Sequence, residues 1–346
     1  MNKHILLVFA TITVFFYSCT KDPNPSDNRD YSKGSFIVNE GEFQSGTGTI
    51  TYFDGNSATQ DIFGQQNNGA ALGNICQSMI KFGDKYFIAV NNADKIEVVN
   101  AADFKSIATI ANVSYPRYFA TDDKKLYVTS WNKDFATGAI IELDPINFKV
   151  IKSIPINGLV EKMIFSEKRI YATVSTLPTD VLAKQIIVVN PNTNTLSYHI
   201  EIGDNTNDLV EDQNGTLWVL CSGFSDWSDP SLNTDGSLNW IGDAVHSIKV
   251  ANGAKGLVID KAGQNLYYLA AGKVWHHDIS SSEPQAINDL SGSYYSIGLN
   301  KNTGDIYLAD AGDFQKSGII TVFNPNTKVK TIFNAGIIPS FFYFAE

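Results

Sequence analysis

Cysteine and positive charge are both scarce in this chain of 346 residues. Of its 3 Cys residues, Cys76 and Cys221 stand at no spacing that is typical of a metal site or a redox pair. We expect both to be buried and reduced, with a disulfide between them as the alternative. The net charge is −10 and no Lys/Arg cluster follows the N-terminus, so the charge pattern speaks against nucleic acid as a partner.

Catalytic motifs are missing as well. The sequence contains no HExxH motif and no recognisable grouping of serine, histidine and acid. His276 and His277 fall on one expected strand, where neighbouring side chains point to opposite faces, which argues against a shared metal ion. We therefore assign no catalytic residue, no metal ligand and no cofactor, and expect the chain not to be an enzyme.

Charged residues make up only 18% of the chain, whereas aromatic residues reach 12%, with 15 Tyr and 21 Phe. This balance favours strands over long exposed helices. Hydrophobic residues account for 43%, which is ample for a packed core. We expect an all-β protein.

The N-terminus has the pattern of a secretion signal. Lys3 and His4 precede an apolar run, 5–17, that is too short to span a bilayer, and Ser18 with Cys19 resembles a bacterial lipobox. We expect residues 1–18 to be a lipoprotein signal peptide and residues 19–33 to be a lipidated Cys19 with a flexible tether. Ordinary cleavage, with Cys19 unmodified, is the alternative. The expected location is the outer membrane at the cell surface, although a periplasmic side stays open.

A short strand pattern of apolar, aromatic, aliphatic and small residues occurs seven times along the chain. Its aromatic positions are Phe36, Phe87, Tyr127, Tyr171, Trp218, Tyr267 and Tyr307. The spacings are 51, 40, 44, 47, 49 and 40 residues. A period in this range, built from strands and tight turns, is typical of a β-propeller with one four-stranded blade per repeat. We expect a seven-bladed β-propeller over residues 34–346.

The two ends of the propeller complement each other. The first repeat has expected strands at 35–40, 48–53 and 59–63, but no inner strand precedes them. The chain ends in PSFFYFAE, which has the inner-strand pattern and no repeat of its own. We therefore expect residues 340–344 to pair with 35–40 and close the ring, which removes an exposed sheet edge.

Several segments resemble the YncE-like surface propellers of gut bacteria, a family that includes the BtuG-type cobamide-binding lipoproteins. The resemblance spans residues 34–346 and is carried by FIVNEGEFQ near the start, CQSM at 76–79, SYPRYF at 114–119, GDIYLADAGDFQKSGIITVF at 304–323 and GIIP at 336–339. It implies capture of a cobamide, a corrinoid of the vitamin B12 type, for an outer-membrane TonB-dependent transporter. A fold likeness alone does not establish this function.

One face of the propeller is the expected binding surface. Loops that join second to third strands lie together on one face, and here they are 40–47, 131–138, 175–184, 222–236 and 311–318. Aromatic residues are frequent on them: Phe43, Trp131, Phe135, Phe224, Trp227 and Phe314. Exposed apolar patches usually mark binding sites. For Phe43 and Phe135, packing back between blades is the alternative.

Polar residues lie near the expected starts of the inner strands: Gln77, Arg117, Glu161, Asn207, Asp208 and Lys255. They suit amide or phosphate groups of a ligand, or they satisfy one another and trapped water. Our predicted ligand-binding residues are Trp131, Trp227, Phe314, Arg117, Gln77, Glu161, Phe43 and Phe135.

The function classes that stay open are a ligand-binding protein, a protein-interaction scaffold and a lactonase-like hydrolase. The hydrolase would need a divalent ion, for which Glu161, Asn207 and Asp208 are the candidates. The loop at 223–236 also carries three aspartates and an asparagine, which could bind calcium or simply form a polar loop: Asp226, Asp229, Asn233 and Asp235. The loop aromatics favour the ligand-binding protein.

Overall fold

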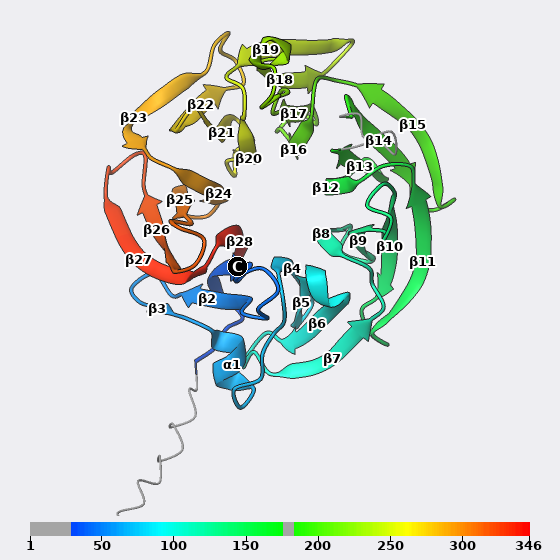
Figure 1. Cartoon of the computed structure of the whole chain (residues 1–346), viewed down its shortest axis with the longest axis vertical. Coiled ribbons are helices and arrows are strands. Elements are labelled where there is room, and N and C mark those ends of the chain that lie inside the picture. The colour runs from blue at the N-terminus through cyan, green and yellow to red at the C-terminus, as the bar shows by residue number, and fades with distance from the viewer. Residues whose placement is uncertain (1–28, 176–182) are drawn as a thin grey trace, which may run out of the picture.

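Seven four-stranded antiparallel sheets stand around a central axis like the blades of a propeller (Figure 1). They come from a computed structural model that describes residues 29–175 and 183–346. The predicted all-β seven-bladed propeller is confirmed. The predicted signal peptide, Cys19 and the tether up to residue 28 lie outside the described residues.

Each blade runs from an inner strand at the central axis to an outer strand at the rim (Figure 1). The inner strands, from blade one to blade seven, are β28 (Pro339–Ala345), β4 (Cys76–Phe82), β8 (Pro116–Thr121), β12 (Val160–Ser166), β16 (Thr206–Glu211), β20 (Lys255–Ile259) and β24 (Tyr294–Asn300). The second strands are β1 (Gly34–Asn39), β5 (Lys85–Val90), β9 (Leu126–Trp131), β13 (Arg169–Val174), β17 (Leu217–Cys221), β21 (Asn265–Ala270) and β25 (Asp305–Asp310).

The third strands are β2 (Thr49–Phe53), β6 (Lys95–Asn100), β10 (Gly138–Asp144), β14 (Gln185–Asn190), β18 (Gly236–Ile241), β22 (Lys273–Asp278) and β26 (Ser317–Phe323). The outer strands are β3 (Ala58–Thr59), β7 (Ser106–Ala111), β11 (Lys149–Ile156), β15 (Thr195–Glu201), β19 (Val245–Val250), β23 (Gln285–Ser291) and β27 (Lys330–Ile337). The short helices are α1 (Ile62–Gln66), η1 (Asn91–Ala93) and η2 (Pro230–Leu232). Among the described residues, no helix has both the length and the apolar character needed to cross a membrane.

The repeated sequence pattern corresponds to the second strand of each blade. These strands are buried on both faces, as in β5, where all residues after Lys85 are buried. Outer strands are mostly exposed, as in β11. Because a second strand packs against neighbouring blades on both sides, its sequence is almost continuously apolar, and the repeat was therefore visible.

The ring is closed by the two ends of the chain, as predicted. Strand β28 pairs antiparallel with β1, with Ser35 opposite Phe344 and Ile37 opposite Phe342. Figure 1 shows β28, in red, beside the blue strands of blade one. Seven hydrophobic clusters lie between the blades, one at each junction, so the core is itself a ring.

The predicted fourth strand of blade one, 59–63, was wrong. Strand β3 ends at Thr59, and Ile62 begins helix α1, which is capped by the Asp61 side chain accepting from the Gly64 N–H at 3.0 Å. Ile62 and Phe63 are both buried in the cluster between blades one and two. A strand would send these neighbours to opposite faces, whereas one helical turn lets both reach the same core.

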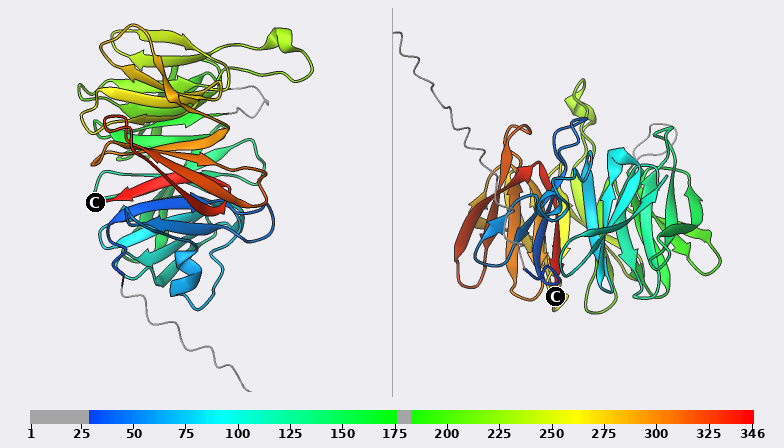
Figure 2. Two further views of the ribbon diagram at one scale, coloured as in Figure 1. Left: turned by 90° about the vertical axis from the view of Figure 1, so that its left-hand side faces the viewer. Right: turned by 90° about the horizontal axis from the view of Figure 1, so that it is seen from below.

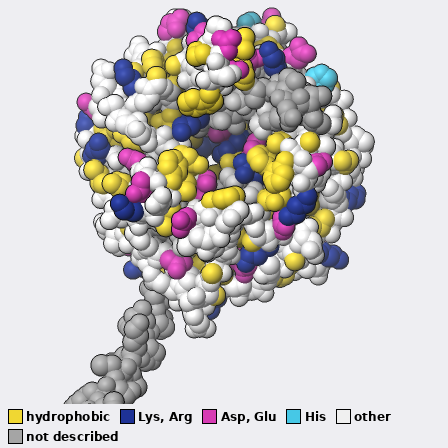
Figure 3. All heavy atoms as spheres, viewed as in Figure 1, with side chains coloured by type: hydrophobic (Ala, Val, Ile, Leu, Met, Phe, Trp, Pro, Cys, Tyr) yellow, Lys and Arg dark blue, Asp and Glu magenta, His cyan; other side chains and the backbone are white. Residues whose placement is uncertain are grey.

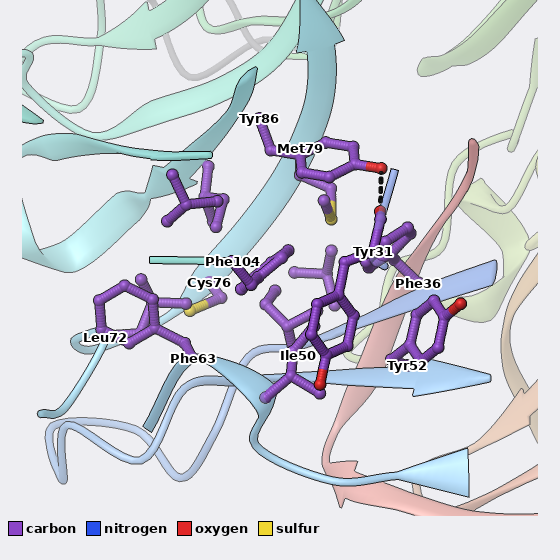
Figure 4. Packing of buried hydrophobic residues seen from close by; sticks show 14 of the residues in the cluster. Tyr31, Phe36, Ile50, Tyr52, Phe63, Leu72, Cys76, Met79, Tyr86 and Phe104 are labelled. Carbon is purple, nitrogen blue, oxygen red and sulfur yellow. Dashed lines mark hydrogen bonds between the residues drawn. The ribbon is translucent and has the colours of Figure 1, made fainter. Parts of the chain in front are cut away.

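Residues within the predicted tether take part in that same cluster (Figure 4). Tyr31 is fully buried, and its carbonyl accepts a hydrogen bond of 2.7 Å from the Tyr86 hydroxyl. Its ring lies 4.9 Å from that of Tyr52 and 5.8 Å from that of Phe104. Ordered packing therefore begins before β1.

Candidate binding face and central channel

Long loops project from one face of the ring, and the C-terminus lies at the other (Figure 2). The β17–β18 loop, which carries η2, and the β1–β2 loop stand out most clearly on that face. We call it the loop face. Inner strands begin there, so their first residues surround the mouth of the central channel. Figure 3 looks onto this face and shows a hollow at its centre with Lys or Arg side chains inside and apolar side chains around it.

A break in strand register occurs near the start of each inner strand that begins at this face. In β8 the shift falls between Pro116 and Phe119, and in β12 between Val160 and Met163. A β-bulge interrupts the alternation of side chains. As a result, neighbours such as Arg117 and Tyr118 both line the channel.

The central channel has a volume of about 510 Å³. Its lining mixes charge and aromatic surface, and includes Glu40, Arg117, Tyr118, Glu161, Lys162, Asn207, Asp208, Lys255, Tyr295 and Phe341. Most of the polar positions predicted at the strand starts are therefore brought together. Gln77 is the exception, because it is 5% exposed and lies behind Arg117.

Arg117 is the centre of a hydrogen-bonded cluster in the channel wall. Its Nε and Nη2 donate to the two carboxylate oxygens of Glu161 at 2.9 and 3.0 Å, and its Nη1 donates to Gln77 Oε1 at 2.6 Å. Gln77 in turn donates to the Tyr118 hydroxyl at 2.9 Å. Burial raises the pKa of Glu161, and the Arg117 charge opposes that rise. Gln77, Arg117 and Glu161 thus satisfy one another.

Trp131 covers this cluster. Its ring lies 4.2 Å from the Arg117 guanidinium carbon, and its indole N–H donates to the Val160 carbonyl at 3.0 Å. A cation stacked on an aromatic face gains electrostatic attraction. The half-buried Trp131 therefore packs on Arg117 and bonds to Val160 within the protein, whether or not it also contacts a ligand.

A second charged pair lies deeper in the ring of inner strands. The Lys162 ammonium is 3.7 Å from Asp208 and 4.2 Å from the centre of the Tyr118 ring. Asp208 also accepts from the Leu209 N–H at 3.0 Å. Burial raises the pKa of Asp208, with Lys162 acting against the rise. Sequence reasoning missed Lys162 and Tyr118. In a regular strand, neighbouring side chains point to opposite faces, so these two would point away from the channel if Glu161 and Arg117 point into it.

The most exposed aromatic side chains lie on loops of the loop face. Trp227 is 98% exposed, Phe43 66%, Phe135 53% and Phe314 48%. Phe43 and Phe135 are therefore not buried between blades, which was the alternative for these two residues. Phe135 does touch Tyr115, with 5.0 Å between the ring centres. These four residues form a set of aromatic positions that are open to solvent on the loop face.

Two of these phenylalanines are held by the same local device. Asp134 accepts from the N–H groups of Ala136 and Thr137 at 2.9 and 3.0 Å, and the intervening Phe135 has φ 51°. Asp313 accepts from the N–H groups of Gln315 and Lys316 at 3.0 and 2.9 Å, and the intervening Phe314 has φ 63°. A bulky residue in the left-handed region is strained. The aspartate turn holds each ring outward despite that strain.

The possible calcium ligands of the 223–236 loop are used in contacts within the protein. Asp226 accepts from the N–H groups of Ser228 and Asp229 at 2.7 and 3.0 Å, so it caps its own backbone. Asp235 forms an ion pair with Lys249. Over residues 29–175 and 183–346, no group of three or more His, Cys, Asp or Glu side chains is arranged to hold a metal ion.

The two cysteines of the propeller are both buried and free, as expected. Burial raises the pKa of Cys221 to about 12 and that of Cys76 further. A thiol in such surroundings is a poor nucleophile. Both cysteines therefore serve as small core residues.

Solved structures share this fold at low sequence identity. A quinonprotein alcohol dehydrogenase-like protein from Bacteroides thetaiotaomicron is 15% identical over 92% of this chain and 80% of that chain, with a TM-score of 0.67. A Bacteroides fragilis protein provisionally named a 6-phosphogluconolactonase is 13% identical over 94% and 100%, with a TM-score of 0.62. Hydrazine synthase from Kuenenia stuttgartiensis is 13% identical over 92% and 99%, with a TM-score of 0.59. At these identities the likeness shows the fold alone.

The family of the chain comes from its sequence. No curated protein sequence matches it. Residues 33–344 match the family model described as "Domain of unknown function (DUF5074)". Because that range runs from β1 into β28 and so includes every blade, the chain belongs to the DUF5074 family.

Proposed function

We propose that this protein is a surface-anchored binding protein that captures a cobamide on its loop face for an outer-membrane TonB-dependent transporter. The observation that carries the proposal is the set of four exposed aromatic side chains on loops of the loop face. Exposed apolar surface gathered on one face usually marks a binding site. The resemblance to YncE-like surface propellers, BtuG-type lipoproteins among them, supports the choice of ligand.

The chemistry of a corrinoid suits this face. A corrin ring is a broad apolar disc fringed with amides, so it gains from flat aromatic contacts with polar groups beside them. Trp227 and Phe314 offer open aromatic surface. Arg117 lies in the channel wall with 15% of its side chain exposed and is held in one orientation by Glu161. A fixed donor loses little freedom when a ligand arrives.

The test is calorimetric titration of the purified protein with cyanocobalamin, first on the native chain and then on a Trp227→Ala/Phe314→Ala double variant. Losing two aromatic contacts should cost about 2 to 4 kcal/mol at ~25 cal/mol per Å² of apolar surface. The affinity should then fall roughly thirty- to a thousand-fold. We do not choose Trp131→Ala, because it would also uncover Arg117 and remove the bond to Val160.

Ile146→Ala is the matched control. Ile146 is 79% exposed but lies in the β10–β11 turn, away from the loop face, so its loss should leave binding unchanged. No heat and no melting shift at high micromolar cyanocobalamin would end the cobamide proposal. Tight binding that the double variant leaves intact would keep the ligand and reject these contacts.

Anchoring through Cys19 and export to the cell surface are part of the same proposal. Protease treatment of intact cells should release the propeller if the anchor faces the exterior. Protection of the protein in intact cells, with cleavage only after lysis, would place it in the periplasm. Copurification of the transporter with the native lipoprotein is the corresponding test of the partner.

A protein-interaction scaffold is the second candidate. It is favoured by Trp227, which is 98% exposed on the β17–β18 loop that projects from the loop face (Figure 2). A scaffold would show no thermal shift with any small molecule, because only binding to the native state raises its apparent stability. The hydrolase alternative gains no support from the carboxylates, since Glu161 is bound to Arg117 and Asp208 is paired with Lys162.

A further inference from the structure

A separate groove opens beside the channel, between blades six and seven. We call it the side groove; its volume is about 410 Å³, and its lining includes Lys255, Gly272, Lys273, Tyr294, Tyr295 and Phe314. Lys255 and Tyr295 also line the channel, so the two spaces adjoin. The side groove is therefore part of the loop face.

Aromatic side chains make one wall of the side groove. The Phe314 and Tyr295 rings meet edge to face, with 5.6 Å between their centres. Phe314 stays 48% exposed, and it is held in its turn by Asp313. This wall offers a preformed apolar surface to a flat ligand group.

Lys255 supplies a cation that the protein itself does not neutralise. Its ammonium lies 5.2 Å from the centre of the Tyr295 ring, and no carboxylate of the described residues forms an ion pair with it. Arg117 and Lys162, in the same channel, each have an acidic partner. Burial alone lowers the pKa of Lys255, with no charged group restoring it.

The remaining charges of the side groove do not cancel this cation. Lys273 adds a second, exposed ammonium at the edge. Asp310 is also in the lining, but one of its oxygens accepts from the Gly312 N–H at 2.8 Å and neither forms an ion pair with a lysine. A partly buried ammonium without a partner is costly, and a bound anion would remove that cost.

We propose that the side groove binds an apolar ring that carries an anionic group, with the ring against Tyr295 and Phe314 and the anion on Lys255. This inference deepens the proposed function, because it rests on the loop face being a ligand-binding surface. It does not depend on the ligand being a cobamide.

The probes are a pair of dyes that share a naphthylamine frame: 1-anilinonaphthalene-8-sulfonate, which is anionic, and N-phenyl-1-naphthylamine, which is uncharged. Fluorescence titrations use the chain from residue 20 onward, which keeps the whole described propeller. We expect Lys255→Met to weaken binding of the sulfonate at least fivefold and to leave the uncharged dye within twofold. Phe314→Ala should weaken both dyes, which locates them in the side groove.

Lys255→Arg should restore most of the sulfonate affinity, and Lys124→Met, an exposed lysine in the β8–β9 turn, should change nothing. Circular dichroism of each variant checks that the propeller is intact. Unchanged sulfonate binding by Lys255→Met, equal losses for both dyes, or no sulfonate binding that depends on Phe314 would each overturn the proposal. Corrinoids play no part here, so a failed cyanocobalamin titration would leave this result standing.

Discussion

Single residues in the channel wall hold charges that are largely removed from water. Arg117 and Glu161 expose only 15% and 14% of their side chains and are joined by two hydrogen bonds. Moving charges out of water costs several kcal/mol per ion, and close pairing repays that cost only when the geometry is good. The pair therefore fixes the shape of the channel more than it adds to stability, and losing one partner is the damaging event.

Replacing Glu161 with Gln should lower the free energy of unfolding by about 3–5 kcal/mol, because Arg117 is left buried without a counter-charge. Replacing both residues with Met should cost less than this single change. Urea unfolding of the three proteins measures the comparison. As a control, Lys316→Met removes an exposed pair with Asp313, at 86% and 47% exposure, and should change stability by less than about 1 kcal/mol. A double Met variant that loses more stability than Glu161→Gln would contradict this account.

Glu40 gives a prediction with a pH dependence. Burial raises its pKa above the ordinary glutamate value of 4.5, although the Arg117 charge and a hydrogen bond from the Tyr295 hydroxyl act against this. Folding therefore takes up a proton, and the stability that Glu40 contributes is present below pH 4.5 and is lost as the pH rises through its folded pKa. Glu40→Gln should thus be more stable than the native protein at pH 8 and equal to it at pH 4. Urea midpoints at the two values check the sign, and a difference that grows toward low pH would refute it.

At the scale of elements, predictability follows burial. The second strands were found because both of their faces are packed, which leaves a continuous apolar pattern that repeats with the blades. The closing strand was found because its pattern had no repeat of its own. Helix α1 was missed because Ile62 and Phe63, taken alone, are consistent with a strand end.

Bulges explain what was missed in the site. Arg117 and Glu161 were predicted from their place at strand starts, but Tyr118 and Lys162 follow them directly and would point away in a regular strand. Register shifts depend on backbone geometry, which the residue types do not specify. The pairing of Glu161 with Arg117 agrees with the alternative in which these polar residues satisfy one another. Which residues would pair could not be read from the sequence, because the two partners are 44 residues apart on neighbouring blades.

Deleting residues 338–346 tests the closing strand. The deletion exposes the edge of β1 and uncovers Ile37, which packs in the same hydrophobic cluster as Phe342 and Phe344 of β28. We expect loss of cooperative unfolding or a melting temperature lower by more than about 10 °C, since a 1 kcal/mol loss shifts it by ~2–4 °C in a domain of this kind. Phe342→Ala, which truncates a side chain that is 8% exposed, should be milder and still cooperative, with a loss of about 3–5 kcal/mol. Unchanged melting of the truncated protein would contradict the role of β28.

In the whole molecule, the hydrophobic cores, the charged residues and the exposed aromatic residues occupy different regions of the propeller. The cores lie between blades, the charged network lines the channel, and the exposed aromatics stand on the loop face. Although the net charge is −10, the channel lining includes Lys255, a basic side chain without an ion pair among the described residues, beside the paired Arg117 and Lys162. Surface composition alone therefore does not describe what a ligand meets at the mouth.

The pairing of β28 with β1 also sets an order of assembly. Six blades consist of strands that follow one another in the chain, so each can form as soon as its own residues are available. Blade one holds the first three strands and the last, and it waits for residues more than 300 positions away. Contacts between such distant residues are slow to form. During synthesis, blade one stays incomplete until the residues of β28 emerge, and a chain cut short before them leaves its first blade open.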